Sequence, residues 1–318
     1  MSGPKLFANV LFPVVVFTGI LVLILIVPPV GLVASIVLPT PIVLIFLSHG
    51  RQAGLIAAAL LFFIFYGLSG STQVLVLLGE FTVMAFLLAE TIKGQFSFEK
   101  CILISAIGSA LVSLSLMFSL YGGGDKSLTV LFQEKFKKSV EVSLKSLKGT
   151  GEEMSGPDNL EEIIEETSKK LARSYPALIA VGSLFTAMIN YFFILWIWPR
   201  FYGSALVFSG EFSEWSLPDY FVWPFILSAV GAFFTGDAVQ VVGMNLFILL
   251  LMIYFLQGIA IVHHFLQTKK VPVVFRVIAF ILIFTQPVFI GLAIGMGVFD
   301  LWVDFRKIRA KSSEMDES

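Results

Sequence analysis

Residues 7–27 read FANVLFPVVVFTGILVLILIV and contain no Lys, Arg, Asp or Glu. Residues 52–79 form a second uncharged run of the same kind. An α-helix rises about 1.5 Å per residue, so about twenty apolar residues cross a hydrocarbon core about 30 Å thick. Because lipid cannot hydrogen-bond an open backbone, each run is predicted to be a transmembrane helix.

The composition of the whole chain agrees with a membrane protein. Of its 318 residues, 57% are hydrophobic and 14% are charged, and the net charge is −1. Such a charge provides no basic surface for nucleic acid. The single cysteine, Cys101, cannot form an intrachain disulfide, and His49, His263 and His264 do not make a metal-type cluster with it. We therefore expect no metal site and no cofactor.

The hydrophobic pattern predicts an all-α, polytopic transmembrane helical bundle of about 8–10 spans. The predicted spans are 7–28, 31–48, 53–69, 72–92, 100–121, 176–198, 219–235, 238–264 and the long stretch 272–303. Pro39 and Pro41 predict a kink or break in the second span, with freed carbonyl groups that need protein partners. The stretch 272–303 would be about 48 Å long as one helix. Since Gln286-Pro287 interrupts it, two short crossings or a re-entrant hairpin are preferred to one tilted helix.

Residues 125–174 are the only large polar insert. Apolar residues recur every fourth position in the first half, which indicates an amphipathic helix with mostly basic charges. The second half has the same periodicity with mostly acidic charges. A Gly-rich turn joins the halves, so the insert is predicted to be an extramembrane antiparallel helical hairpin.

The distribution of Lys and Arg predicts how the chain is threaded through the membrane. The basic loop residues are Arg51, Lys93, Lys100, Lys269 and Lys270. The positive-inside rule then places the N-terminus in the cytoplasm and the helical hairpin outside. The resulting organisation is an N-terminal bundle (1–123), the hairpin (124–175), a C-terminal bundle (176–305) and a cytoplasmic tail (306–318).

Glu80 is the most informative single residue, because it lies near the middle of the span 72–92. A charged side chain at that depth costs about 2.5–3.5 kcal/mol on insertion scales, so it needs a reason to be there. One interpretation is a solute or proton site, or a carboxylate paired across helices. The other is a structural hydrogen bond next to Gly79, which allows close helix approach.

Uncharged polar residues also occur inside predicted spans. Asn190 and Asn245 are candidate substrate-binding residues together with Glu80, although such side chains usually hydrogen-bond between helices. Gln257 lies too far along the same helix to share a ligand with Asn245. Asp300 and Asp304 share a helix face and could bind a cation, or they form a charged cap with nearby Arg306.

We find no nucleophile elbow, no phosphate-binding Gly-rich loop and no zinc-protease motif, so no catalytic residue is assigned. An enzyme that acts on a lipid carrier is a third possibility without an acid/base constellation to support it.

Several segments resemble a known family. They include Phe212-x-x-Trp215-x-Leu217-Pro218, Phe255-Leu256-Gln257-Gly258 and the ending at 297–307, GVFDLWVDFRK. Over essentially the whole chain they resemble the uncharacterised bacterial YybS-like membrane proteins. Pro39-x-Pro41, the segment 47–51 and Gly54 are also similar to the S components of energy-coupling-factor vitamin transporters. The second resemblance implies a micronutrient-binding helical bundle.

Taken together, these features predict a multi-pass protein of the bacterial cytoplasmic membrane. The leading hypothesis is that it binds or transports a small solute in an S-component-like bundle. The alternative is a non-catalytic membrane scaffold for envelope or division machinery, which docks a membrane protein partner through the hairpin.

Overall fold

The computed structural model describes residues 34–70, 73–122, 128–148, 160–202, 212–234 and 236–308, together with Pro13, Val16, Gly19 and Ile20. Most of the predicted first span and the tail after residue 308 lie outside these residues. The described residues contain ten α-helices, two short 3-10 helices and no β-strand. The all-α prediction is therefore confirmed.

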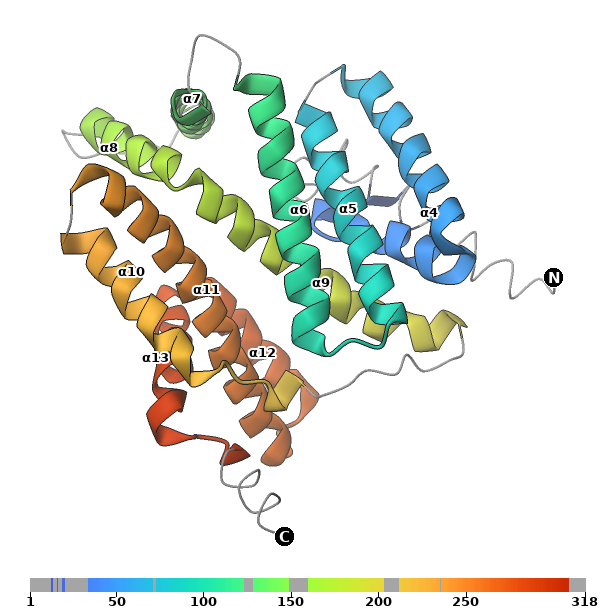
Figure 1. Ribbon diagram of the computed structural model, residues 1–318, viewed down its shortest axis with the longest axis vertical. Coiled ribbons are helices and arrows are strands. Elements are labelled where there is room, and N and C mark those ends of the chain that lie inside the picture. The colour runs from blue at the N-terminus through green and yellow to red at the C-terminus, as the bar shows by residue number, and fades with distance from the viewer. Residues whose placement is uncertain are drawn as a thin grey trace. The chain divides into compact units, whose positions relative to one another are not determined.

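The chain divides into two compact units (Figure 1). Unit 1 comprises residues 1–94 and 101–206, and unit 2 comprises residues 95–100 and 207–318. The α-helices that lie mainly in unit 1 are α4 (Pro39–Ser69), α5 (Gln73–Lys93), α6 (Phe98–Tyr121), α7 (Leu128–Lys148), α8 (Leu160–Arg173) and α9 (Tyr175–Tyr202). Unit 2 contains η2 (Phe212–Glu214), η3 (Asp219–Phe221), α10 (Val222–Phe234), α11 (Asp237–Thr268), α12 (Val273–Thr285) and α13 (Pro287–Val303).

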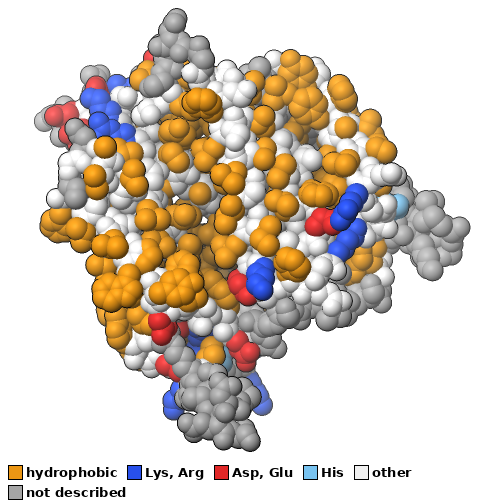
Figure 2. Space-filling model, in the orientation of Figure 1, with side chains coloured by type: hydrophobic (Ala, Val, Ile, Leu, Met, Phe, Trp, Pro, Cys, Tyr) orange, Lys and Arg blue, Asp and Glu red, His pale blue; other side chains and the backbone are white. Residues whose placement is uncertain are grey.

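Five of the described helices are long and apolar enough to cross a membrane. They are Pro39–Ile64, Leu75–Lys93, Phe98–Tyr121, Tyr175–Tyr202 and Ala238–Thr268, and the bent pair α12 and α13 makes up to six. Large hydrophobic side chains remain exposed on them, for example Phe63 at 71% and Leu111 at 59%. In Figure 2, hydrophobic side chains spread over the visible face, whereas charged side chains gather in a few small groups. This surface suits lipid, not water.

The range of α4 covers two helices that meet at a kink at Gly50, where the backbone is not helical. This kink lies at the predicted boundary between the spans 31–48 and 53–69. Gly50 has φ +87°, a value that residues with a side chain rarely adopt. The break at the two prolines is confirmed, because a turn at 36–38 precedes α4 and the helix begins at Pro39.

The long apolar stretch near the C-terminus is broken where the sequence predicted. Helices α12 and α13 meet at Gln286 and Pro287, and their axes differ by 98°. One straight tilted helix is therefore excluded. Pro287 has no N–H to continue the α12 ladder, and its fixed φ suits the first turn of a new helix.

Helices in unit 2 approach one another so closely that only glycine fits at the crossing points. A Cβ on Gly258 of α11 would lie 1.9 Å from the Ala293 carbonyl oxygen on α13. A Cβ on Gly297 of α13 would lie 2.0 Å from the Tyr254 carbonyl oxygen. A Cβ on Gly243 of α11 would lie 2.6 Å from the backbone of α10. These backbone contacts explain why α10, α11 and α13 pack as one group.

Helices α7 and α8 correspond to the predicted hairpin. They pack against each other, and α8 continues through Ser174 directly into α9. In Figure 1, α7 is seen end-on and α8 lengthwise, so the two helices cross instead of running antiparallel. The Phe132 ring of α7 stacks on Tyr175 at 4.8 Å, which ties α7 to the start of α9.

The pKa of the Glu165 carboxylate on α8 is expected to depend on two lysines. Its carboxylate pairs with Lys169 at 2.9 Å and with Lys137 of α7 at 3.3 Å, and these hydrogen bonds lower the pKa of Glu165. A depressed pKa means that the stabilisation is complete above the ordinary Glu pKa of about 4.3 and is lost as the pH falls through the folded-state pKa. Because the group is exposed, the effect on stability is small.

Carboxyl NMR titration of Glu165 measures this effect. The variants Lys169→Gln and Lys137→Gln should each move the pKa of Glu165 back toward its ordinary value. Lys170→Gln is the control, because Lys170 pairs with Glu166 instead, at 3.5 Å. Equal titration curves for all three variants would contradict the assignment.

Candidate functional site

Three helices of unit 1 meet at the Glu80 carboxylate. Glu80 is contributed by α5, and the Ser183 hydroxyl of α9 donates a hydrogen bond to its Oε1 at 2.7 Å. The Ser113 hydroxyl of α6 also hydrogen-bonds the carboxylate. Ser183 is fully buried and Ser113 is 3% exposed, so both hydroxyls are held inside the unit. We call Glu80, Ser113 and Ser183 the Glu80 site.

The sequence around the Glu80 site explains how α5 and α6 come together. Gly79 leaves room for the Leu116 side chain, because a Cβ there would lie 2.6 Å from Leu116 Cδ1. Gly108 likewise leaves room for Leu87. Small residues on both helices therefore let Ser113 reach the carboxylate across the interface.

No Lys, Arg or His among the described residues forms an ion pair with Glu80. The two neutral hydroxyls leave acceptor positions on the carboxylate, which offers about four lone-pair sites. The arrangement can therefore bind a proton or a positively charged group without displacing a protein cation.

Asn190 of α9 forms hydrogen bonds to the chain at the break before α4. Its Nδ2 donates to the carbonyl oxygen of Ile36 at 2.8 Å and to that of Thr186 at 2.7 Å. The Thr40 hydroxyl donates to Asn190 Oδ1 at 2.7 Å. The Ile36 carbonyl oxygen needs this partner because the Thr40 N–H, its donor in a regular helix, bonds to the Val37 carbonyl oxygen instead. The freed carbonyl predicted from Pro39 and Pro41 is therefore satisfied by a residue of α9.

Replacing Asn190 with alanine is expected to lower the free energy of unfolding by about 1–3 kcal/mol, because it leaves the buried Ile36 carbonyl and the Thr40 hydroxyl unpaired. Denaturant unfolding in detergent micelles measures the effect. Gln267→Ala, at the exposed end of α11, is the control and should stay within about 0.5 kcal/mol of the wild type. A similar stability for both variants would show that Asn190 is not structurally required.

Asn245 of α11 belongs to unit 2, whereas Glu80 and Asn190 belong to unit 1. The Asn245 Nδ2 donates to the Val241 carbonyl oxygen of its own helix at 2.8 Å. Asn245 also lies two residues from Gly243, where α10 and α11 are in close contact.

Polar groups gather around the kink in α4. Arg51 forms a bidentate ion pair with Glu90 of α5, with N···O distances of 3.0 and 2.6 Å. The Lys93 ammonium donates to the Phe46 carbonyl oxygen at 2.6 Å. Since the helix breaks at Gly50, this carbonyl has lost its usual partner four residues on. The kink is therefore held by two side chains from the end of α5.

A buried polar cluster in unit 2 was not predicted as a unit from the sequence. Arg306 pairs with Asp300 at 2.8 Å, and Gln257 of α11 donates to the same Asp300 Oδ2 at 3.0 Å. Arg306 also donates to the carbonyl oxygens of Ser213 and Trp215, at 3.0 and 2.8 Å. We call Gln257, Asp300 and Arg306 the Asp300 cluster.

The Asp300 cluster joins the three segments that carried the strongest family resemblance. The Leu217 N–H donates to Gln257 Oε1 at 3.3 Å, and the Phe305 N–H donates to Asp300 Oδ1 at 3.0 Å. Phe98 adds an aromatic contact to the same segment, with its ring 4.9 Å from that of Phe212. The charged-cap interpretation of Asp300 therefore agrees with the structure.

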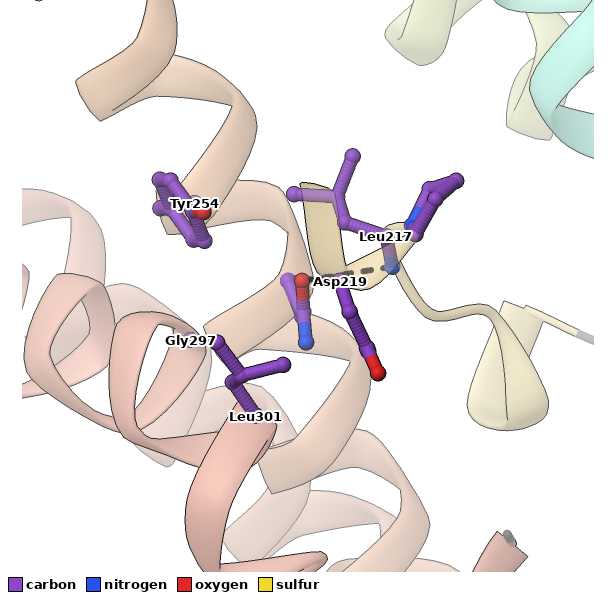
Figure 3. Close-up of a pocket in the computed structure, with 7 residues that line it drawn as sticks. Leu217, Asp219, Tyr254, Gly297 and Leu301 are labelled. Atoms are coloured by element: carbon purple, nitrogen blue, oxygen red, sulfur yellow. Dashed lines mark hydrogen bonds between the residues drawn. The ribbon is translucent and has the colours of Figure 1, made fainter. Parts of the chain in front are cut away.

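A small pocket of about 10 Å³ lies beside this cluster (Figure 3). In Figure 3, Tyr254 is on α11, Gly297 and Leu301 are on α13, and Leu217 and Asp219 are on the segment before α10. The residues that line it are Leu217, Pro218, Asp219, Tyr254, Gln257, Gly297 and Leu301. At this volume it has room for about one water molecule and not for a small-molecule ligand.

A larger apolar groove of about 550 Å³ lies between α4, α5 and α6 of unit 1. Its lining residues are Leu55, Ala58, Ala59, Phe62, Phe63, Leu75, Leu78, Gly79, Thr82, Val83, Val112 and Leu116. Gly79 and Val112 directly precede Glu80 and Ser113 in the sequence. The groove and the Glu80 site therefore occupy neighbouring faces of the same two helices.

Within the described part of the chain, no three His, Cys, Asp or Glu side chains gather as they would around a metal ion. Cys101 is buried and has no disulfide. His263 and His264 are neighbours on α11, and adjacent helical residues point about 100° apart.

A sequence model of the family described as "Predicted membrane protein (DUF2232)" matches residues 15–301. The comparison with curated proteins and the comparison with solved structures gave no match.

Proposed function

The chain belongs to the DUF2232 family of predicted membrane proteins, and we propose that it binds or transports a small solute, with Glu80 as the residue that contacts it. One observation carries this proposal. Glu80 is a carboxylate in the middle of a membrane span, and its described partners are two serine hydroxyls. An ionisable group at such depth marks a solute or proton pathway more often than a purely structural contact.

Asp300, a buried acid among the described residues, provides a comparison. Asp300 is neutralised by the Arg306 guanidinium and also accepts hydrogen bonds from Gln257 and the Phe305 backbone. A structural carboxylate is thus fully paired in this protein. Within the described part of the chain, Glu80 has no such cation, so a proton or the positive group of a solute would complete its environment.

The neighbouring apolar groove supports a solute with an apolar body. Its volume of about 550 Å³ lies within the range for small-molecule sites. Leu55 and Phe63 at its edge are 52% and 71% exposed, so the groove opens toward lipid. We therefore favour an amphipathic solute with a cationic or hydrogen-bonding group near Glu80. A vitamin-like micronutrient, as in the S components of energy-coupling-factor transporters, fits this description.

Ligand binding by the purified full-length chain tests the proposal. A panel of vitamin-like and amphipathic amine compounds is screened by thermal shift in neutral detergent. For any compound that binds, Glu80→Gln should weaken the affinity about tenfold or more, because a charge-assisted interaction is lost. Glu90→Gln is the matched control: it makes the same change on the same helix, at the exposed Arg51 pair.

Two outcomes would contradict the proposal. A ligand that binds equally well to Glu80→Gln would remove Glu80 from the site. A panel without a single binder, measured on protein that is monodisperse in size-exclusion chromatography, would count against solute binding itself.

The second candidate function is a membrane scaffold whose docking surface is α7 and α8. The observation that favours it is the set of exposed charges on α8, which include Glu162, Glu166, Lys170 and Arg173. Deletion of residues 125–174 should then abolish crosslinking to a partner and leave the remaining spans folded. Under both candidates the chain is placed in the bacterial cytoplasmic membrane, with the N-terminus inside and α7 and α8 outside.

A further inference from the structure

The two hydroxyls that contact Glu80 suit both of its protonation states. The Ser183 hydroxyl lies 2.7 Å from Glu80 Oε1, and the Ser113 hydroxyl bonds to the same carboxyl group. A hydroxyl donates to a carboxylate, and after rotation of its O–H bond it accepts from a carboxylic acid. Because each serine can do both, Glu80 can gain or lose a proton without any change in the packing of α5, α6 and α9.

No other ionisable residue of α5, α6 or α9 lies near the Glu80 site along its helix. Each is at least eight residues from Glu80, Ser113 or Ser183 on the same helix, which corresponds to about 12 Å along the axis. The nearest are Glu90 on α5, Tyr121 on α6, and Tyr175 and Tyr191 on α9. The tyrosine phenols are uncharged near neutral pH, and the Glu90 carboxylate is paired with Arg51.

The chain before α5 brings no charge to the site either. On α4, which packs against α5, His49 and Arg51 lie next to the kink, where Arg51 is already bonded to a carboxylate of α5. Tyr66 is a phenol of α4 and is 42% exposed. Residues 7–38 contain no ionisable side chain. Within the described part of the chain, only a proton or a bound cation is therefore left to neutralise Glu80.

An ionised carboxylate without a cation is costly at this depth, and uptake of a proton removes the charge. Asp300 differs, because the Arg306 guanidinium is held 2.8 Å away and neutralises it permanently. On the basis of the proposed solute site, we infer that Glu80 holds a proton while the site is empty and releases it when the cationic group of a solute binds. The carboxyl O–H bond breaks, the proton passes to water, and the carboxylate pairs with the cation. Binding of one solute cation is thereby coupled to the release of one proton.

A carbodiimide tests whether Glu80 holds the proton. Dicyclohexylcarbodiimide is apolar and adds to a protonated carboxyl group: the proton passes to a carbodiimide nitrogen, the oxygen bonds to the central carbon, and the adduct rearranges to an N-acylurea without loss of any atom. The apolar groove beside Glu80 gives the reagent access from lipid. In the purified full-length chain, peptide mass spectrometry should find the adduct on Glu80, with more at acidic than at alkaline pH. Asp300 is the internal control and should stay unlabelled, because it is paired with Arg306.

Serine variants show whether the labelling reports on this site. Ser183→Ala removes a donor that stabilises the carboxylate form, so labelling of Glu80 should extend to more alkaline pH. Ser105→Ala is the matched control and should be labelled like the wild type. Ser105 is also a fully buried serine, but its hydroxyl donates to the Cys101 carbonyl oxygen of its own helix at 2.7 Å.

A permanent cation tests the exchange. Tetraphenylphosphonium has apolar rings that suit the groove and no ionisable proton, so any proton released on binding comes from the protein. It should protect Glu80 from the carbodiimide, and a pH-sensitive dye in weakly buffered solution should report about one proton per bound cation. Its affinity, measured by equilibrium dialysis, should rise about tenfold per pH unit over the range in which Glu80 is protonated. Glu80→Gln corrects for uptake by detergent and should release no proton.

Two results would overturn the inference. Absence of the adduct on Glu80 at every pH would show that the empty site is ionised; the solute proposal would survive, because a cation can still bind to the carboxylate. An adduct on Glu80 without protection or proton release by tetraphenylphosphonium would exclude the exchange. Failure of the proposed function gives a different pattern, in which Glu80 is labelled but no compound of the ligand panel binds more weakly to Glu80→Gln.

Discussion

Arg306→Met is expected to lower the free energy of unfolding by about 3–5 kcal/mol, because it leaves the Asp300 carboxylate buried without its cation. The two side chains are only 1% and 4% exposed, so water cannot replace the lost partner. The Ser213 and Trp215 carbonyl oxygens would lose their donor in the same step. Denaturant unfolding in mixed lipid–detergent micelles measures the change.

The matched control for Arg306→Met is Arg51→Met. Arg51 also forms an ion pair, with Glu90, but the two side chains are 69% and 23% exposed. An exposed pair contributes about 0–1 kcal/mol, so this variant should remain close to the wild type. Adding Asp300→Asn to Arg306→Met should recover part of the loss, since the buried charge is then removed. Similar losses for Arg306→Met and Arg51→Met would show that burial is not the cause.

Gly258→Ala is expected to destabilise the protein by about 3 kcal/mol or more, at or beyond the upper end of the usual cost of overpacking. The new Cβ would lie 1.9 Å from the Ala293 carbonyl oxygen, and that atom belongs to the backbone of α13. The helices must therefore move apart, because no side chain can rotate out of the way. Gly297→Ala should have a similar effect, with its Cβ 2.0 Å from the Tyr254 carbonyl oxygen.

Two other glycines of α13 provide the control for this prediction. Gly291 and Gly295 have no atom within 4 Å of an added Cβ. Their replacement with alanine should be neutral or stabilise by about 0.4–1 kcal/mol, since it restricts the unfolded chain. Unfolding curves of the four variants in the same micelles settle the comparison. A loss of stability in all four would indicate a general intolerance of α13 instead of specific backbone contacts.

The sequence was sufficient for the features that depend on local composition. The uncharged runs predict membrane helices, and the prolines at 39, 41 and 287 predict helix breaks that the structure confirms. The depth of Glu80 within its span also follows from the length of the apolar run. Each of these features depends on residues that lie within about one helix length of one another in the sequence.

The partners of polar residues could not be predicted in the same way. Asn190 bonds to Thr40, 150 residues away, and Gln257 bonds to Asp300, 43 residues away. Arg306 reads as a basic residue of an exposed tail, yet it is 5% exposed. It reaches Asp300 because Asp304 adopts φ +43° and turns the chain back after α13. Such a turn at a residue other than glycine has no clear local sequence signal.

The kink at Gly50 shows the same limit. The kink falls at the predicted boundary between the spans 31–48 and 53–69, but the side chains that contact it were not predicted. The kink is stabilised by Lys93 and by the Arg51–Glu90 pair, and both Lys93 and Glu90 lie in the last turn of α5. Apart from the presence of the basic residues themselves, no local pattern indicates these contacts.

The place of Arg306 in the chain has a consequence for biosynthesis. The ribosome makes this guanidinium after all the helices of unit 2, although Asp300 and Gln257 cannot be buried favourably without it. During synthesis, the carboxylate of Asp300 therefore enters the membrane region with no counterion. A nascent product that stops before residue 306 carries an uncompensated acid at the end of its last helix. Such a product should be a preferred substrate for membrane quality-control proteases.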